Sequence, residues 1–227
     1  FDIALTDQLT LTAGVRDTTD ERTSGPGQTF LLFSPLTPYP TGLTAAAGPQ
    51  LGVEFQATTW NLAARYEFNP DLSVYATVRR GFKSGGFNPN AINPADAQFR
   101  PEEVTDYEIG VKGQQFFGDT QVRYAVNIFY DDYTDIQRFV NLATVPASTV
   151  TRNAAAGTIA GIDLDLIVAP TPWLSATLQY TYLDAQYDSY TDALLGDLSS
   201  SRFPNTPEHQ LTFTPRVEFA LADGMGD

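Results

Sequence analysis

The chain has 227 residues, 42% of them hydrophobic, and its 27 Asp and Glu against 13 Lys and Arg give a formal net charge of −14. With no Cys and one His, a disulfide scaffold, a zinc ribbon, an iron–sulfur site and a Cys nucleophile are excluded, and a His-based metal site is disfavoured. The negative charge argues against a nucleic-acid partner, because such binding depends largely on Lys and Arg that neutralise phosphates. No apolar run approaches the roughly 18 residues of a transmembrane helix, whereas a membrane β-barrel stays open because its hydropathy signal is weak.

Side chains alternate between apolar and polar along most of the chain. Eight segments show this period of two: 9–16, 60–68, 72–79, 106–112, 122–131, 162–168, 174–182 and 210–219. Such alternation predicts β-strands with one apolar and one polar face. A short ninth strand is predicted at 1–5, and no segment of comparable length shows the helical period of 3.6.

The connections between these strands alternate in length. Short turns rich in Gly, Pro, Asn and Asp are predicted at 6–7, 69–71, 117–119, 170–172 and 222–224. Long connections are predicted at 17–52, 84–102, 138–158 and 185–206. Antiparallel strands with tight turns at one end and long loops at the other are typical of an outer-membrane barrel. The alternative is a β-sandwich with its polar face in solvent, which lacks this strict alternation.

The two faces of the strands have different expected surroundings. One set is predicted to face lipid: Val74, Val126, Ile128, Leu164, Leu166 and Leu178. The set of opposite parity is predicted to face a water-filled or protein-filled lumen: Arg65, Arg123, Asn127, Asp163, Asp165 and Gln179. Aromatic pairs near strand ends, such as Tyr66 with Phe68 and Tyr180 with Tyr182, fit the girdles that mark membrane interfaces.

Five runs resemble, in order and spacing, segments of the barrel of TonB-dependent outer-membrane receptors. They are 74–88 (VYATVRRGFKSGGFN), 100–112 (RPEEVTDYEIGVK), 127–137 (NIFYDDYTDIQ), 153–164 (NAAAGTIAGIDL) and 203–209 (FPNTPEH). The resemblance covers about residues 1–220 and implies an all-β, antiparallel up-and-down transmembrane β-barrel. The chain then represents a fragment of about eight strands from a larger barrel of about 22 strands.

The resemblance also implies a function and partners. It indicates an outer-membrane receptor of Gram-negative bacteria, not an enzyme, for TonB-energised uptake of a scarce nutrient such as a ferric siderophore, cobalamin or saccharide. Residues 1–227 are expected to be a partial barrel domain, without the plug domain, the TonB box and the last strand of a full member. Expected partners are TonB and the plug domain, through those missing parts, together with lipopolysaccharide, outer-membrane lipid and a small nutrient or metal chelate.

Two other functional hypotheses remain open from the sequence. A passive porin-like channel shares the strand pattern but lacks the set of resembling runs. An isolated fragment with open β-edges is the other alternative, because unpaired strand edges recruit other chains into oligomers or β-rich aggregates.

The glycine-rich segment 79–88 is the first choice for a ligand-binding site. It offers cationic, polar and stacking side chains together: Arg79, Phe82, Lys83, Phe87 and Asn88. The parity of Arg79 points it inward near the mouth, whereas Arg80 is expected to meet lipopolysaccharide phosphates at the rim. The alternative is a structural corner, in which the glycines at 81, 85 and 86 adopt positive φ. A phosphate-binding loop is excluded because no helix follows.

Other polar residues do not form a catalytic constellation. Asp131, Asp132 and Asp135 could offer oxygen ligands to calcium, but a solvated loop mouth is favoured because the pattern of an EF-hand loop is missing. Asp163 and Asp165 share a strand face, which is ordinary in a wet barrel, and a single His completes no convincing triad. No catalytic residue, resident metal or cofactor is predicted.

Overall fold

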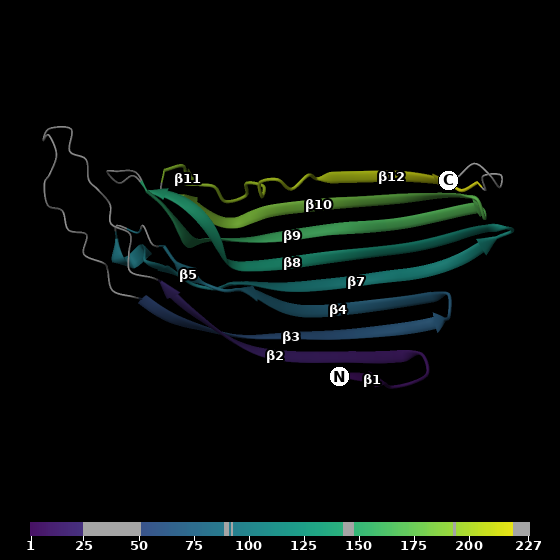
Figure 1. Cartoon of the computed structure of the whole chain (residues 1–227), viewed down its shortest axis with the longest axis horizontal. Coiled ribbons are helices and arrows are strands. Elements are labelled where there is room, and N and C mark those ends of the chain that lie inside the picture. The colour runs from purple at the N-terminus through teal and green to yellow at the C-terminus, as the bar shows by residue number, and fades with distance from the viewer. Residues whose placement is uncertain (25–50, 89–90, 92, 143–147, 193, 220–227) are drawn as a thin grey trace, which may run out of the picture.

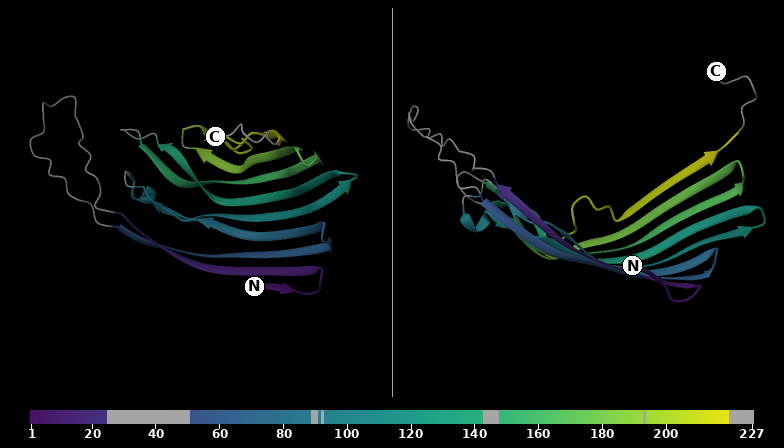
Figure 2. Two further views of the ribbon diagram at one scale, coloured as in Figure 1. Left: turned by 45° about the vertical axis from the view of Figure 1, so that its right-hand side comes forward. Right: turned by 60° about the horizontal axis from the view of Figure 1, so that its bottom comes forward.

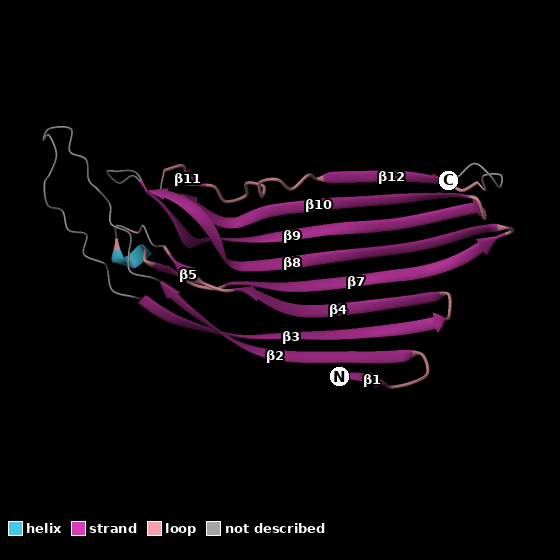
Figure 3. Ribbon diagram, viewed as in Figure 1, coloured by secondary structure: helices cyan, strands magenta, loops and turns pink. Residues whose placement is uncertain are grey.

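The computed structural model of the chain describes residues 1–24, 51–88, 91, 93–142, 148–192 and 194–219. Ten strands form a single antiparallel sheet, whose main path runs β1-β2-β3-β4-β7-β8-β9-β10-β11, with β12 also paired to β10 (Figure 1). In the described residues the only helix is a 3-10 turn, η1 (Pro94–Asp96), so strands dominate Figure 3. No helix within these ranges is long and apolar enough to cross a membrane.

The strands confirm the period-two reading of the sequence. The main sheet contains β1 (Asp2–Ala4), β2 (Leu9–Ser24), β3 (Leu51–Asn69), β4 (Leu72–Lys83), β7 (Glu102–Phe117), β8 (Thr120–Leu142), β9 (Ser148–Thr171), β10 (Leu174–Asp192), β11 (Gly196–Asp197) and β12 (His209–Val217). A separate two-stranded sheet pairs β5 (Gly86–Phe87) with β6 (Gln98–Phe99). Each of the eight predicted long strands is present, and β1 is the predicted short one.

The strands are longer than predicted, and much of the expected long connections is strand. β8 extends to Leu142 and pairs with β9 as far as Leu142↔Ser148, inside the connection predicted at 138–158. A register shift between Tyr133 and Ile136 breaks the alternation, and Asp135 has a φ of 54° there. Beyond a bulge, the side chains of a strand lie on the opposite face. A search of the sequence for strict alternation therefore ends at the bulge, although the pairing between the two strands continues past it. The turn predicted at 222–224 lies outside the described residues.

Tight turns gather at one end of the sheet and longer connections at the other. The β3–β4, β7–β8 and β9–β10 turns all lie at the turn end, on the right in Figure 1. Asn69 Oδ1 accepts the backbone N–H of Asp71 at 2.9 Å, and Gly118 supplies the φ of 62° that its turn requires. The right-hand view of Figure 2 shows that the sheet is curved, not flat.

The register places the two predicted sets of side chains on opposite faces, as expected. Val126 pairs with Leu164, and Leu178 pairs with Leu166. The apolar face is open: Leu62 is 56% exposed and Ile109 60% exposed. A contiguous apolar face of this kind is rare on a protein surrounded by water, so it requires an apolar covering.

The buried core lies at the far end, away from the tight turns. Its residues are Phe55, Ile136, Val140, Leu142, Val150, Ala155, Ala185 and Tyr187. One cluster joins Ile136, Ala155 and Tyr187 to Phe203, which lies on the connection after β11. A one-layer sheet has no second layer to pack against, so burial occurs only where connecting segments fold back over the long strands.

Candidate functional site

The polar face forms a continuous wall of cross-strand ion pairs and hydrogen bonds. Arg79 on β4 reaches two carboxylates of β7: its Nε lies 2.5 Å from Asp106 Oδ1, and a terminal nitrogen lies 3.1 Å from Glu108 Oε2. The Tyr75 hydroxyl donates to the other oxygen of Glu108 at 2.5 Å. Because the β4–β7 register pairs Arg79 directly with Asp106, the ladder itself brings these groups together.

The paired carboxylates of β9 belong to the same wall. Asp163 accepts hydrogen bonds from Thr181 at 2.7 Å and from Asn127 at 3.4 Å. Asp165 accepts one from Gln179 Nε2 at 2.9 Å. The structure thus confirms that both carboxylates share one face, where Asp163 accepts two hydrogen bonds and Asp165 one from side chains of neighbouring strands.

Glycines on this wall let aromatic rings lie flat against it. A Cβ added at Gly110 would come within 2.6 Å of the Tyr75 ring, and one at Gly161 within 2.5 Å of the Phe129 ring. The rings cover the glycines of the next strand, which keeps bulky side chains close to the sheet and stabilises the ladder.

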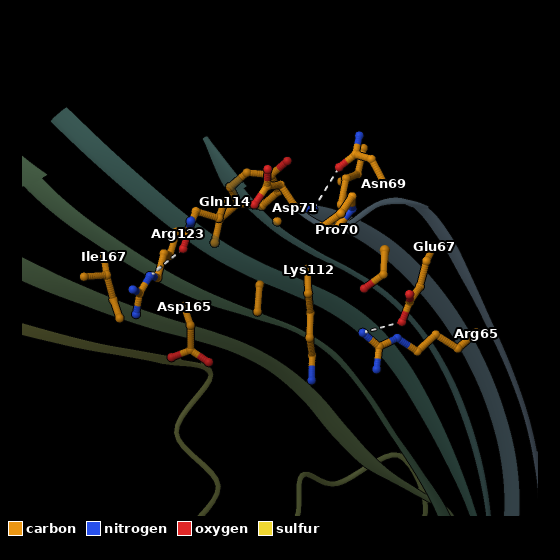
Figure 4. A pocket seen from close by; sticks show the side chains of 15 residues that line it. Arg65, Glu67, Asn69, Pro70, Asp71, Lys112, Gln114, Arg123, Asp165 and Ile167 are labelled. Atoms are coloured by element: carbon orange, nitrogen blue, oxygen red, sulfur yellow. Dashed lines mark hydrogen bonds and ion pairs between the residues drawn. The ribbon is translucent and has the colours of Figure 1, made fainter. Parts of the chain in front are cut away.

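A hollow opens on the polar face beside the tight turns, with a volume of about 380 Å³ (Figure 4). We call it the turn-end hollow. Its lining is Arg65, Glu67, Asn69, Pro70, Asp71, Leu72, Ser73, Lys112, Gly113, Gln114, Arg123, Tyr124, Ala125, Asp165 and Ile167. Arg65 pairs with Glu67 at 3.1 Å, and Arg123 Nε donates to Gln114 at 2.9 Å.

A second hollow of about 560 Å³, the far-end hollow, lies at the opposite end of the sheet. Its lining is Arg22, Thr23, Lys83, Ser84, Gly85, Gly86, Phe87, Phe99 and Gln137. Two cations and two aromatic rings therefore meet around one space. This combination suits an anionic or aromatic ligand, through charge and cation–π or stacking contacts.

The glycines in and beside this hollow have a structural role, but its basis is close packing and not the predicted positive φ. The φ angles of Gly81, Gly85 and Gly86 all lie outside the left-handed region, so the prediction of positive φ was wrong. A Cβ at Gly85 would instead come within 2.5 Å of the buried Phe55 ring. Close packing between the segment and β3 requires glycine at this position.

The structure separates the five residues proposed for ligand binding. Lys83 and Phe87 line the far-end hollow, and the Lys83 ammonium lies 3.8 Å from Glu102. Arg79 lines a different space of about 340 Å³ together with Arg16 and Asn61. The two remaining residues are in neither space: Phe82 and Asn88. The predicted set is therefore not one site, although two of its members share the far-end hollow.

Asn88 instead belongs to a polar clasp that sequence reasoning missed. Its side chain donates to the carbonyl oxygens of Asp96 and Thr151, each at 2.7 Å, and accepts the Thr151 N–H at 2.8 Å. The Arg152 guanidinium donates two hydrogen bonds to the Asp96 carboxylate, from Nε to Oδ1 at 2.6 Å and from a terminal nitrogen to Oδ2 at 2.8 Å. These contacts fix the segment around η1 onto β9.

Two further amides complete the clasp. Gln137 Nε2 donates to the carbonyl oxygens of Ser84 and Arg100 at 2.9 and 3.0 Å. Asn153 donates to Arg100 O at 2.9 Å and accepts the Arg100 N–H at 2.7 Å. The clasp residues Asn88, Gln137 and Asn153 all lie in the runs that resemble a known family, so a signal was present. The sequence did not show that these separate runs meet.

The ion pair of the clasp shifts the pKa values of both its members. Asp96 is only 5% exposed, and its hydrogen bonds from the Arg152 guanidinium hold the pKa of that carboxyl below its ordinary value. The same contacts raise the pKa of Arg152. Burial acts in the opposite direction, because it disfavours the charged carboxylate, and the hydrogen bonds from the arginine outweigh it.

The acidic residues near the end of the regular part of β8 do not converge. Asp131 pairs in register with Asp106 on the polar face, and Asp135 forms an ion pair with Arg100 at 2.6 Å. Asp132 has the opposite parity to Asp131. Across the described ranges, no group of three or more His, Cys, Asp or Glu side chains is placed to hold a metal ion.

Comparisons with known proteins agree with this architecture. A family model described as TonB dependent receptor-like, beta-barrel matches residues 1–224. A vitamin B12 transporter, BtuB, of Photobacterium profundum is 30% identical over 137 residues, which cover 56% of this chain and 21% of that protein. The chain thus matches about a fifth of the length of this curated relative.

Solved structures show the same fold. The ferric yersiniabactin uptake receptor FyuA of Yersinia pestis aligns with a TM-score of 0.67 and 21% identity, over 92% of this chain and 28% of that one. The siderophore receptor PiuA of Acinetobacter baumannii aligns with a TM-score of 0.65 and 19% identity, over 93% and 29%. With its ten-stranded antiparallel main sheet, its two contrasting faces and a family match over nearly its whole length, the chain belongs to the TonB-dependent-receptor-like β-barrel family.

Proposed function

We propose that the chain is part of the barrel of an outer-membrane receptor that takes up a scarce nutrient by TonB-energised transport. The observation that carries the proposal is the contrast between an open apolar face and a hydrogen-bonded polar wall on one curved antiparallel sheet. In this proposal residues 1–227 are a partial barrel domain of a Gram-negative outer-membrane protein. The plug domain and TonB box would come from residues outside this chain.

The proposed orientation places the apolar face in lipid and the polar wall toward the lumen. Aromatic side chains support this, because Trp60 and Phe68 lie on the apolar face of β3 at the two ends of residues 60–68, a length close to the roughly 9–11 residues with which a tilted strand crosses a membrane. The tight turns then face the periplasm and the far end faces outward. Arg80, paired with Glu103, would lie at the outer rim, near the phosphates of lipopolysaccharide.

The far-end hollow is the proposed place for the nutrient. Lys83 is 65% exposed and only loosely paired, so its ammonium is available to an anionic ligand beside the Phe87 and Phe99 rings. Arg79 does not line this hollow, and its guanidinium already pairs with Asp106 and Glu108. It would therefore act at a different place, nearer the turn end of the wall. Ferric siderophores, cobalamin and saccharides are the proposed substrate classes. The names of the vitamin B12 and siderophore receptors among the similar proteins support the first two.

Uptake by intact cells tests the proposal. Cells that produce the complete receptor containing this chain would be given labelled ferric siderophores, cobalamin and oligosaccharides in turn, with and without TonB. We expect saturable uptake of at least one compound that disappears without TonB. Uptake that rises linearly with concentration and ignores TonB would instead favour a porin-like channel.

A further inference from the structure

The hydrogen-bonded ladder between β4 and β7 is interrupted beside the far-end hollow. Its last pair is Lys83↔Glu102, and pairing resumes at Gly86↔Phe99 in the separate β5–β6 sheet, which lies beyond the tip of β4 in Figure 1. Pro101 lies in this gap and has no N–H, so a regular ladder cannot continue through it. The β5–β6 sheet carries both aromatic rings of the hollow, so the gap separates them from the ammonium on β4.

The Gln137 side chain joins the two arms of the chain across this gap. Its Nε2 donates to Ser84 O at 2.9 Å on one arm and to Arg100 O at 3.0 Å on the other. Both partners are acceptors, so the amide presents its two N–H donors to them, and both carbonyl groups are satisfied. Gln137 also lines the hollow, so it replaces the missing rung of the ladder at the wall of the candidate site.

The backbone of Gln137 is tied to the cation of the same hollow. Its N–H donates to Glu102 Oε2 at 2.8 Å, and this oxygen lies 3.8 Å from Lys83 Nζ. A register shift lies on each side of Ile136, and Asp135 has a φ of 54°. Bulges near barrel rims commonly redirect a side chain, and a strained backbone often marks a functional position. One residue of β8 thus contacts both arms and the acid beside Lys83.

We infer that Gln137 is a positioning residue of the far-end hollow, whose amide bridges the gap in the ladder and holds the two aromatic rings in a fixed place beside the Lys83 ammonium. A site that is already held in its binding geometry loses less conformational entropy when a ligand binds. The inference rests on the proposed function, because it concerns the hollow proposed for the nutrient. It adds a residue that sets affinity through other residues.

The first measurement is the position of the β5–β6 sheet in the complete receptor within outer-membrane vesicles. This chain has no Cys, so Gln98→Cys on β6 and Gln56→Cys on β3 place two spin labels, in a background without other cysteines. Pulsed electron paramagnetic resonance gives the distribution of distances between the labels. The second measurement, in receptors without these labels, is the Kd of an anionic aromatic chelate, the ferric complex of 2,3-dihydroxybenzoate labelled with iron-55.

The test variant is Gln137→Met, which removes both hydrogen bonds at similar side-chain length. If it does not assemble, as judged by heat-modifiable migration, Gln137→Asn replaces it, because the shorter amide cannot reach both carbonyl groups. Gln137→Lys is the rescue variant, since its ammonium keeps the donors. Asn141→Ala is the matched control: Asn141 lies on the same strand and accepts a hydrogen bond from Thr149 at 2.8 Å, but it does not line the hollow.

We expect Gln137→Met to broaden the distance distribution and to raise the Kd of the chelate about tenfold, with an unchanged number of binding sites. A residue needed only for assembly would lower the number of sites and leave the Kd unchanged. Gln137→Lys should keep the distribution narrow, and Asn141→Ala should alter neither measurement.

Four results would overturn the inference: an unchanged distance distribution, an unchanged Kd, the same changes in Asn141→Ala, or no measurable binding of the chelate by the unaltered receptor. The proposed function fails separately. If the unaltered receptor shows no TonB-dependent uptake, the function is wrong even where Gln137→Met raises the Kd. If uptake depends on TonB and the Kd does not change, only the positioning inference fails.

Discussion

Replacing Asp96 by Asn tests whether the clasp holds the segment around η1 in place. Asp96 is 5% exposed and accepts two charge-assisted contacts from Arg152, at 2.6 and 2.8 Å. A charge-assisted hydrogen bond contributes about 1.5–3 kcal/mol. The Arg152 side chain is 40% exposed, so water replaces part of the lost interaction, and asparagine keeps one acceptor. We therefore expect local opening to become easier by about 2 kcal/mol.

Hydrogen exchange in the complete receptor measures this directly. The reporting amides are Asn88 N–H, bonded to Ala97 O at 2.9 Å, and Thr151 N–H, bonded to the Asn88 side chain at 2.8 Å. About 2 kcal/mol corresponds to exchange that is about 30-fold faster. Glu208→Gln is the control, because its ion pair with Arg202 is 45% exposed on both sides and should leave these amides unchanged. Equal exchange in Asp96→Asn and the unaltered protein would refute the reasoning.

The pH dependence gives an independent check on the same residue. Arg152 lowers the pKa of Asp96 from its ordinary value of 3.8, so ionised Asp96 stabilises the folded clasp. This contribution is present above pH 3.8 and is lost as pH falls through the lowered pKa of the folded state. After correction for intrinsic exchange rates, protection should drop below about pH 4 in the unaltered protein. A drop of the same size in Asp96→Asn would show that another group is responsible.

Further predictions concern the faces and the wall. Leu166→Arg should destabilise the folded barrel by about 2–4 kcal/mol, measured by denaturant unfolding in lipid, and a near-neutral effect would show that this face does not meet lipid. Lys83→Ala should weaken binding of an anionic substrate about tenfold or more, whereas Arg80→Ala should leave it nearly intact, and equal effects in an uptake assay would contradict the placement of the substrate in the far-end hollow. Gly110→Val should reduce the yield of heat-modifiable folded barrel, because its side chain would collide with Tyr75, and a normal yield would show that the ring can move aside. The chain expressed alone should associate through its strand edges in light scattering, and a stable monomer would argue against open edges.

The alternation of side chains was sufficient to predict most of the fold. Segments such as 122–131 and 174–182 place apolar groups on one face and polar groups on the other in any extended conformation, because the period of a strand is two. Turn residues such as Asn69 and Gly118 fixed where the chain reverses, since their local hydrogen bonds and backbone conformations need no distant partner. Local chemistry therefore determined the strands, their faces and the tight turns.

The arrangement of the far end of the sheet could not be predicted from the sequence and is known only from the tertiary structure. β8 and β9 continue past a bulge that reverses the parity of the side chains, which hid their length from a period-two reading. The candidate residues of 79–88 were chosen because they are neighbours in sequence, yet the fold divides them among the wall, the far-end hollow and the clasp. Proximity in the chain does not decide which side chains meet across a sheet.

Sequence alone thus determined that this protein consists of strands with two chemically opposite faces, because that pattern is local and repeats every two residues. Only the tertiary structure decided that Asn88 binds Thr151, that Asp96 meets Arg152 and that Lys112 and Arg123 share a hollow. These contacts depend on the register between strands and on how connections fold back over them. Register is set by the whole ladder of hydrogen bonds and packed side chains, so no single segment encodes it.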